Sequence, residues 1–433
     1  MSVLDTIYGI DLGTTYSLIS EYEGYTSPLV PSVVDFITRE VGDSVKDNFE
    51  ESTLRSYKRS ISKVNKPSIA ASYLVLDKLR KMMLEHKSLP LDTIIKAVIS
   101  VPAKFNAEQR ECTLIAAKKA KIDVQKLINE PTAAALHLSG SETTSVVYDL
   151  GGGTCDITIT KASDGKLTTL ATVGLLKGGD DLDLALRDFL WNKYSVRFFT
   201  LDESSKLKWK EYARKLKHKM QDINIKEASV SVLGNIISLT AKEYKDCVMA
   251  TFLDTFTLLK NTIEQVGLKP KEYKLIPVGG STHCPILRQI LEDVTGTKCE
   301  EQVYNPDEAV VKGDAYFAHA LQNGTALNLI QIEAPSIYVK INNQFIKLIS
   351  DGSPLPASGV IAVNPTFDTQ TKVSFEVYAG DKTTLLQKIE YDFKERPIKF
   401  ESILIIKCTV MYDGIPQILC YGLDRPGKCV KLC

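Results

Sequence analysis

Hydrophobic positions in the first 322 residues follow two periods. Short apolar runs separated by turn residues, as in residues 6–37 and 94–101, indicate β-strands. Longer stretches carry apolar side chains at helical spacing, as residues 67–87 do, and Asn106 is placed to cap another helix. Further helices are predicted near residues 181–194, 204–221, 241–266, 286–295 and 307–322. Strands that alternate with long helices are typical of an α/β fold with largely parallel sheets, here over residues 1–322.

The pattern changes after residue 322. Residues 323–335 resemble an interdomain linker with an apolar stretch at 327–332. The runs beyond it are short, alternating and β-branched, and proline or glycine turns separate them: IYVKI, FIKLI, KVSFEVY, ILIIKCTVMY and QILCYGL. We therefore expect a small all-β domain over residues 336–433.

Composition narrows the class of protein. A chain of 433 residues is too long for one hydrophobic core. Lys+Arg and Asp+Glu both total 53, so the charge gives no sign of a nucleic-acid partner. Nine cysteines are scattered singly, which argues against a zinc site or a disulfide framework. The N-terminus does not resemble a secretory signal and the longest apolar run, 403–411, is too short to span a bilayer, so we expect a soluble cytoplasmic protein without membrane insertion.

Two glycine turns share one sequence pattern. IDLGTT at residues 10–15 and YDLGGGT at 148–154 both contain a strand, Asp-Leu-Gly and small hydroxyl residues, 138 positions apart. This repetition suggests an internal duplication, with two α/β lobes that each offer a turn to one ligand. A third glycine turn, VGGST, follows at 278–282.

The chemistry of these turns favours phosphate binding. Glycine allows consecutive backbone N–H groups to converge on an anion, and threonine hydroxyls add donors. Asp11, Asp149 and Asp156 lie at the neighbouring strand ends, where bare carboxylates would repel a phosphate, so a largely water-coordinated Mg²⁺ is implied between them. Either hairpin alone is equally an ordinary glycine turn, but the three turns together favour a nucleotide site.

Eight motifs in order and at similar spacing carry a resemblance to the 70-kDa heat-shock protein family: GIDLGTTYS, YKRSI, ISVPAKFNAEQR, INEPTAAAL, YDLGGGTCDITI, KGGDDLD, PVGGSTHCP and YNPDEAV. The motifs cover residues 7–322, and residues 323–433 resemble the family only weakly. The resemblance implies an actin-like ATPase domain followed by a β-sandwich that binds peptides. The implied ligands are ATP or ADP, Mg²⁺ and, as a further candidate, K⁺. The implied partners are unfolded or extended polypeptides, a J-domain co-chaperone and a nucleotide-exchange factor.

The same resemblance implies a role for each motif. Lys58 would stabilise charge on the transferred phosphoryl group, and Glu130 would orient the attacking water. Asp149 and Thr154 would complete the catalytic set, while Asp11 and Asp156 would hold hydrated Mg²⁺. On the residues alone, Lys58 is equally a solvated lysine in a basic run and Glu130 an ordinary helix start. The other implied nucleotide-binding residues are Gly13, Thr14, Thr15, Tyr16, Gly151, Gly152, Gly153, Gly178, Gly179, Arg214, Lys217, His218, Gly279, Gly280, Ser281, His283 and Asp307.

Several positions depart from the family pattern. His218 and His283 stand where the family stacks adenine between arginines, so we expect weaker ATP affinity, with Arg214 and Lys217 on the same helical face as His218. Cys155 replaces an aromatic residue, and we expect a small buried side chain there. The segments on either side of Lys58 are short, which puts exchange-factor docking in doubt.

The C-terminal part departs further. The linker keeps its alternation, so we expect it to dock as an edge strand. No helical lid follows the β-sandwich in this sequence, so we expect fast peptide release.

Three functional hypotheses remain open on the sequence. The first is an ATP-hydrolysing chaperone with a minimal peptide-binding domain. The second is a specialised homologue that binds ATP with little turnover, either a ribosome-associated co-chaperone or a virus-encoded virion-assembly and movement protein. The third is a sugar or acetate kinase of the actin-like superfamily, which the NEPTAAA motif and the β domain disfavour.

Overall fold

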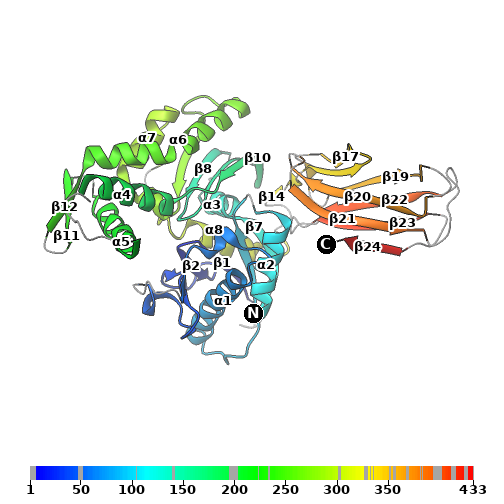
Figure 1. Cartoon of the computed structure of the whole chain (residues 1–433), viewed down its shortest axis with the longest axis horizontal. Coiled ribbons are helices and arrows are strands. Elements are labelled where there is room, and N and C mark those ends of the chain that lie inside the picture. The colour runs from blue at the N-terminus through cyan, green and yellow to red at the C-terminus, as the bar shows by residue number, and fades with distance from the viewer. Residues whose placement is uncertain are drawn as a thin grey trace. The chain divides into compact units, whose positions relative to one another are not determined.

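A computed structural model of the chain divides into two compact units (Figure 1). Unit 1 comprises Met1–Phe105 and Cys112–Ile330, and unit 2 comprises Asn106–Glu111 and Gln331–Cys433. None of the described helices is long and apolar enough to cross a membrane. The described residues are 6–46, 52–103, 105–138, 142–194, 203–222, 224–232, 235–300, 304–325, 330–331, 333–334, 336–350, 353–354, 357–366, 370–380, 382, 384–393, 402–410, 416–423 and 428–432.

The first sheet of unit 1 has five strands in the order β3-β2-β1-β6-β7. Their bounds are Ile7–Asp11 for β1, Tyr16–Ser20 for β2, Val30–Pro31 for β3, Ile95–Val101 for β6 and Ile122–Asn129 for β7. Helices α1 (Lys66–His86) and α2 (Ala107–Lys119) contribute buried side chains to the same core as these strands. The Asn106 cap is confirmed, because its carboxamide accepts a 2.9 Å hydrogen bond from the Gln109 backbone N–H.

The second sheet of unit 1 also has five strands, in the order β13-β8-β9-β10-β14. Their bounds are Thr144–Leu150 for β8, Cys155–Ser163 for β9, Lys166–Leu175 for β10, Lys274–Val278 for β13 and Ile330–Gln331 for β14. Four helices complete its core: α4 (Gly179–Tyr194), α5 (Glu203–Lys219), α6 (Ala241–Val266) and α7 (Pro285–Thr295). A hairpin, β11 (Glu227–Val232) with β12 (Asn235–Thr240), adds to that core.

Two helices connect the sheets. Helix α8 (Ala309–Gln322) packs on β1, and α3 (Glu130–Leu138) packs on β8 and β9, while the two helices pack on each other. Their contact is close because Gly313 has no side chain: a Cβ there would lie 1.8 Å from the Ala133 carbonyl oxygen. The ends of β1 and β8, which carry Asp11 and Asp149, are thereby held near each other.

The mixed α/β class and the predicted helices are confirmed, with boundaries shifted by up to two residues. The expectation of largely parallel sheets is wrong. β1 runs parallel to β6, and β13 parallel to β8, but β1–β2 and β8–β9 are antiparallel pairs joined by the two glycine turns. A tight turn can join only antiparallel neighbours, so the turns themselves impose the mixed topology.

Unit 2 contains two antiparallel sheets that share one core. The larger has the order β17-β16-β20-β21-β24 and the smaller the order β19-β22-β23. Their bounds are Ile337–Ile341 for β16, Gln344–Ile349 for β17, Ala357–Val363 for β19, Lys372–Ala379 for β20, Thr384–Asp392 for β21, Leu404–Val410 for β22, Pro416–Gly422 for β23 and Lys428–Leu432 for β24.

The linker is described only in part. Residues 326–329, 332 and 335 lie outside the described residues, and so do four of the six residues of the predicted apolar stretch 327–332. Ile330 and Gln331 form β14, the strand beside β10 at the edge of the second sheet. The expectation of an edge strand is confirmed for these two residues.

Candidate functional site

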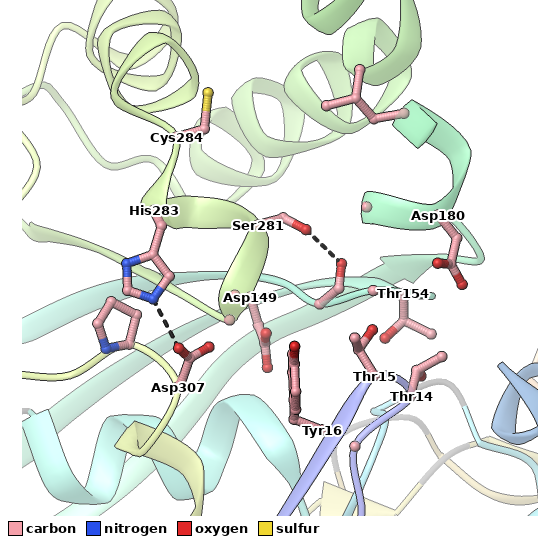
Figure 2. Close-up of a pocket in the computed structure, with 18 of the residues that line it drawn as sticks. Thr14, Thr15, Tyr16, Asp149, Thr154, Asp180, Ser281, His283, Cys284 and Asp307 are labelled. Carbon is pink, nitrogen blue, oxygen red and sulfur yellow. Dashed lines mark hydrogen bonds and ion pairs between the residues drawn. The ribbon is translucent and has the colours of Figure 1, made fainter. Parts of the chain in front are cut away.

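A cavity of about 320 Å³ in unit 1 lies where the ends of the two sheets meet. Figure 2 shows Thr14, Thr15 and Tyr16 on one side, Asp149 and Thr154 facing them, and Ser281, His283 and Asp307 further along the wall. Three segments that are far apart in the sequence therefore converge on one space, in agreement with the three glycine turns.

The first turn is held from behind by Ser32. The Ser32 hydroxyl donates a 2.8 Å hydrogen bond to the Gly13 carbonyl, and the Ser32 N–H donates to the Thr15 carbonyl at 2.7 Å. A Cβ at position 13 would lie 2.0 Å from the Tyr16 carbonyl oxygen, so the turn requires glycine. These contacts leave the Thr14 and Thr15 side chains directed toward the second turn (Figure 2).

The second turn packs against the first turn and against the KGGDDLD segment. A Cβ at Gly152 would lie 1.8 Å from Thr15 Oγ1, and a Cβ at Gly153 would lie 2.7 Å from Thr14 Cγ2. The Gly179 N–H donates to the Gly151 carbonyl at 3.0 Å, and the Asp180 N–H donates to the Gly152 carbonyl at 2.8 Å. A Cβ at Gly178 would lie 2.5 Å from the Gly152 carbonyl carbon. The KGGDDLD segment therefore stacks directly on the GGG turn, and Ser281 Oγ adds a 3.0 Å bond to the Gly151 carbonyl.

Buried charge gathers at the base of the cavity. Asp11, Glu130 and Asp149 line it, and the Lys58 ammonium donates hydrogen bonds to the Glu130 carboxylate and to the Leu12 carbonyl. Lys58 is only 2% exposed. The pKa of Asp11 is raised to about 7, chiefly by burial and then by the charge of Glu130, while Lys58 opposes the shift.

Asp149 lies in the same environment. Burial, followed by the charges of Glu130 and Asp156, raises the pKa of Asp149 well above its ordinary value. Asp156 is its cross-strand neighbour in the β8–β9 pair and is 2% exposed. Lys58 alone does not balance the carboxylates of Asp11, Glu130 and Asp149, so the site favours an additional cation.

Those carboxylates do not form a direct metal cage. Among the described residues, no group of three or more His, Cys, Asp or Glu side chains is spaced to hold a metal ion. The excess of buried carboxylate fits a hydrated Mg²⁺, which keeps most of its own water and needs few protein ligands. Asp11 and Asp149 line the cavity and are placed to receive such an ion.

Helix α5 forms the far wall. Arg214, Lys217 and His218 on α5, and Gln221 in the turn that follows it, line the cavity at positions i, i+3, i+4 and i+7. Lys217 forms a 2.5 Å ion pair with Asp183 and donates to the Gly179 carbonyl at 3.3 Å. Desolvation, followed by the charges of Lys217 and Arg214, lowers the pKa of His218 and favours a neutral ring.

His283 also lines the cavity, on the short helix η5 (Gly280–His283). Its Nε2 is 2.9 Å from a carboxylate oxygen of Asp307, as the dashed line in Figure 2 shows. That hydrogen bond raises the pKa of His283. The two histidines thus carry opposite protonation tendencies across one pocket.

Large apolar and aromatic side chains also line the pocket. Tyr244, Val248 and Phe252 from α6 and Leu287 from α7 line it. An apolar slot flanked by a few convergent polar groups is typical of a site for a flat aromatic ligand.

Most of the predicted site residues line this cavity: Asp11, Gly13, Thr14, Thr15, Tyr16, Glu130, Asp149, Gly151, Gly152, Thr154, Gly179, Arg214, Lys217, His218, Gly279, Gly280, Ser281, His283 and Asp307. Four do not. Lys58 lies behind Glu130, Asp156 lies across the strand pair from Asp149, Gly178 packs on the GGG backbone, and Gly153 faces Arg59.

The sequence analysis missed several lining residues, of which three are polar: Asp180, Asp183 and Gln221. Both aspartates fall within KGGDDLD, and Gln221 continues the helical spacing of Arg214, Lys217 and His218. Extending that spacing by one turn would have identified Gln221.

Cys155 is fully buried in the core of the second sheet. Burial raises the pKa of its thiol well above the ordinary value, so the reactive thiolate is disfavoured. The expectation of a small buried side chain is confirmed.

Comparison with models of protein families matches residues 63–390 to the model described as Hsp70 protein. The match begins just after Lys58 and extends into β21 of unit 2. It covers most of both compact units and therefore far more than half of the chain.

Proposed function

The chain belongs to the Hsp70 family, whose members are generally ATP-binding chaperones, and from that premise we propose that it hydrolyses ATP to control polypeptide binding by unit 2. In this proposal unit 1 is an actin-like ATPase domain of two duplicated lobes over residues 1–322. Residues 323–335 form the linker, and residues 336–433 form a β-sandwich for extended peptides.

One observation carries the proposal: both glycine turns and the buried carboxylates line a single cavity, which α5 and η5 also line. The turns offer backbone N–H groups and threonine hydroxyls for phosphates. The apolar side chains that line the cavity together with His218, His283 and Gln221 suit an adenine base. The distribution of chemistry matches that of a nucleoside triphosphate.

Each side chain has a proposed task. Thr14, Thr15 and Thr154 bind phosphate oxygens, and Asp11 with Asp149 holds hydrated Mg²⁺, which would neutralise charge on the phosphates. Glu130 positions the attacking water and accepts a hydrogen bond from it. Lys58, through its hydrogen bond to Glu130, orients that carboxylate and offsets part of the buried negative charge.

A single-turnover assay with radiolabelled ATP tests this assignment. Glu130→Gln keeps the size of the side chain and is expected to slow hydrolysis at least about 100-fold while ATP affinity changes little. Glu85→Gln, on the exposed face of α1, is the matched control and should hydrolyse ATP at the wild-type rate. An unchanged rate in Glu130→Gln would overturn the catalytic assignment.

A second candidate is nucleotide binding with little turnover. It is favoured by the position of Lys58, which does not line the cavity and instead bonds Glu130 and the Leu12 carbonyl. In that case wild-type protein and Glu130→Gln would bind ATP alike, and both would hydrolyse it at the same slow rate. The specialised homologues among the sequence hypotheses correspond to this outcome.

A further inference from the structure

An aromatic strip crosses the outer face of the larger sheet of unit 2. Tyr338 on β16 pairs with Tyr378 on β20, which in turn pairs with Leu385 on β21. Paired residues of antiparallel strands share one face, so these side chains form a row. Phe345 on β17 joins them through edge-to-face contacts, with ring centroids 5.2 Å from Tyr378 and 6.4 Å from Tyr338. We call these four residues the aromatic strip.

The strip is not part of the core. Ile337, Val339 and Val377 alternate with its members along the strands and point inward, where they are fully buried. Phe345 is 36% exposed and Leu385 is 42% exposed. Tyr338 and Tyr378 are half-buried. A contiguous patch of large, partly exposed apolar side chains is typical of a recognition surface.

Lysines surround the strip. Lys382 Nζ lies 5.0 Å from the centroid of Tyr338, and Lys347 Nζ lies 5.7 Å from it. Lys340 Nζ lies 5.7 Å from the centroid of Phe345. Among the described residues, neither Lys347 nor Lys382 forms an ion pair with a carboxylate, so both charges are available to a ligand.

Glu376 is a carboxylate close to the strip among the residues that the structure describes. Glu376 accepts a 2.7 Å hydrogen bond from the Tyr378 hydroxyl and is also paired with Lys388 at 2.7 Å and with Lys340 at 3.8 Å. Its single charge is thus already balanced. A hollow of about 450 Å³, lined in part by Lys340, Glu376 and Lys388, adjoins the strip and provides room for side chains of a ligand.

We propose that the aromatic strip binds extended polypeptides in which carboxylate side chains flank apolar or aromatic residues. The rings would contact the apolar residues, and Lys347 and Lys382 would pair with the carboxylates. A second copy of the chain is disfavoured, because a two-fold contact through this face would bring lysines against lysines. The inference deepens the polypeptide-binding role proposed above and does not depend on the nucleotide site.

Fluorescence anisotropy on the full-length, nucleotide-free protein tests the proposal. Two labelled synthetic peptides share length and apolar residues but differ in their flanks, Asp/Glu in one and Lys/Arg in the other. We expect the acidic peptide to bind at least about tenfold more tightly, and the preference to weaken at high salt. The double variant Lys347→Glu/Lys382→Glu should abolish or invert the preference for the acidic peptide. Lys407 is an exposed lysine on the outer face of the smaller sheet, and Lys407→Glu should leave the preference unchanged.

The apolar contribution has its own matched pair. Phe345→Ala should weaken binding of the acidic peptide several-fold, while Leu419→Ala on β23, which removes a side chain that is 58% exposed, should have no effect. Equal affinity for the two peptides would overturn the proposal. So would control substitutions that weaken peptide binding as much as the substitutions in the strip do. Self-association that Phe345→Ala abolishes, measured by light scattering, would instead assign the strip to a second copy. ATP hydrolysis measured on separate aliquots of the same protein preparations separates failure of this inference from failure of the ATPase assignment.

Discussion

Lys58→Met provides a sharp test of the charge arrangement in unit 1. The substitution keeps an apolar stem of similar length but removes the ammonium that bonds the Glu130 carboxylate. Lys58 is 2% exposed and the side chain of Glu130 is 10% exposed, so the remaining charge cannot be solvated in place. Breaking a buried ion pair by removing one partner costs about 3–5 kcal/mol of unfolding free energy.

That free energy converts into a measurable melting shift. Unfolding entropy is about 2.1 cal/mol/K per residue, or about 0.7 kcal/mol/K over the roughly 320 residues of unit 1. Differential scanning calorimetry at pH 8 should therefore show the transition of unit 1 falling by about 4–7 °C.

The effect should also depend on pH. Lys58 lowers the pKa of Asp11 and of Asp149, so its loss raises both further. Groups whose pKa is raised on folding bind protons more tightly in the folded state. Lowering the pH from 8 to 6 should therefore reduce the difference in melting temperature between the variant and the wild type.

The double variant Lys58→Met/Glu130→Gln supplies the control. Removing both charges should recover most of the lost stability, because no uncompensated carboxylate remains at Glu130. ATP hydrolysis should stay lost in the double variant. A single variant with the wild-type melting temperature at pH 8, or a double variant as unstable as the single one, would refute the reasoning.

Three further predictions concern the same cavity. Gly178→Ala places a Cβ 2.5 Å from the Gly152 backbone and should weaken ATP binding, measured by calorimetry, at least about tenfold. Gly151→Ala should weaken ATP binding far less, because the nearest atom to its Cβ is the Thr154 carbonyl oxygen at 3.8 Å. Equal losses of affinity in the two variants would contradict the packing argument. Asp11→Asn should raise the melting temperature of the metal-free protein at pH 8, because the folded-state pKa of about 7 means that the buried carboxylate is charged there at a cost in stability. The same variant should lose the stabilisation that Mg·ADP gives to the wild type. A metal-free variant that melts below the wild type would contradict the prediction. His283→Gln should lower the melting temperature most near pH 5.5 and least near pH 8.5. The pKa of His283 is raised on folding, so its contribution to stability is full below a pH of about 6.5 and is lost as the pH rises through the folded-state pKa. A difference in melting temperature between variant and wild type that grows with pH would contradict this prediction.

Local signals account for the parts of the fold that were predicted well. Helix α6 matches its predicted bounds because Thr240 and Glu243 form a capping box at one end and Gly267 adopts a left-handed conformation at the other. The strand hairpins followed from Asp-Leu-Gly turns between apolar runs. Sheet direction was predicted wrongly, because apolar periodicity does not report which neighbour a strand pairs with.

The site shows the same division. The glycine turns, the carboxylates at strand ends and the α5 face were all identifiable from residue type and spacing. The burial of Lys58 was not, since a lysine in a basic run is ordinarily solvated and only the position of α3 brings Glu130 to it. The exclusion of Asp156 from the cavity surface likewise depends on its pairing with Asp149 across β8 and β9.

By itself, the sequence determined the order of elements, the turn chemistry and the motifs that mark an Hsp70-family chain, because these depend on residues close together along the chain. Only the tertiary structure decided that Gly152 and Gly153 pack against the threonines of the first turn, that Asp11, Glu130 and Asp149 gather beside Lys58, and that Tyr338, Phe345, Tyr378 and Leu385 of four strands form one strip beside three lysines. These features arise from contacts between residues far apart in sequence, and no local pattern encodes which of them meet.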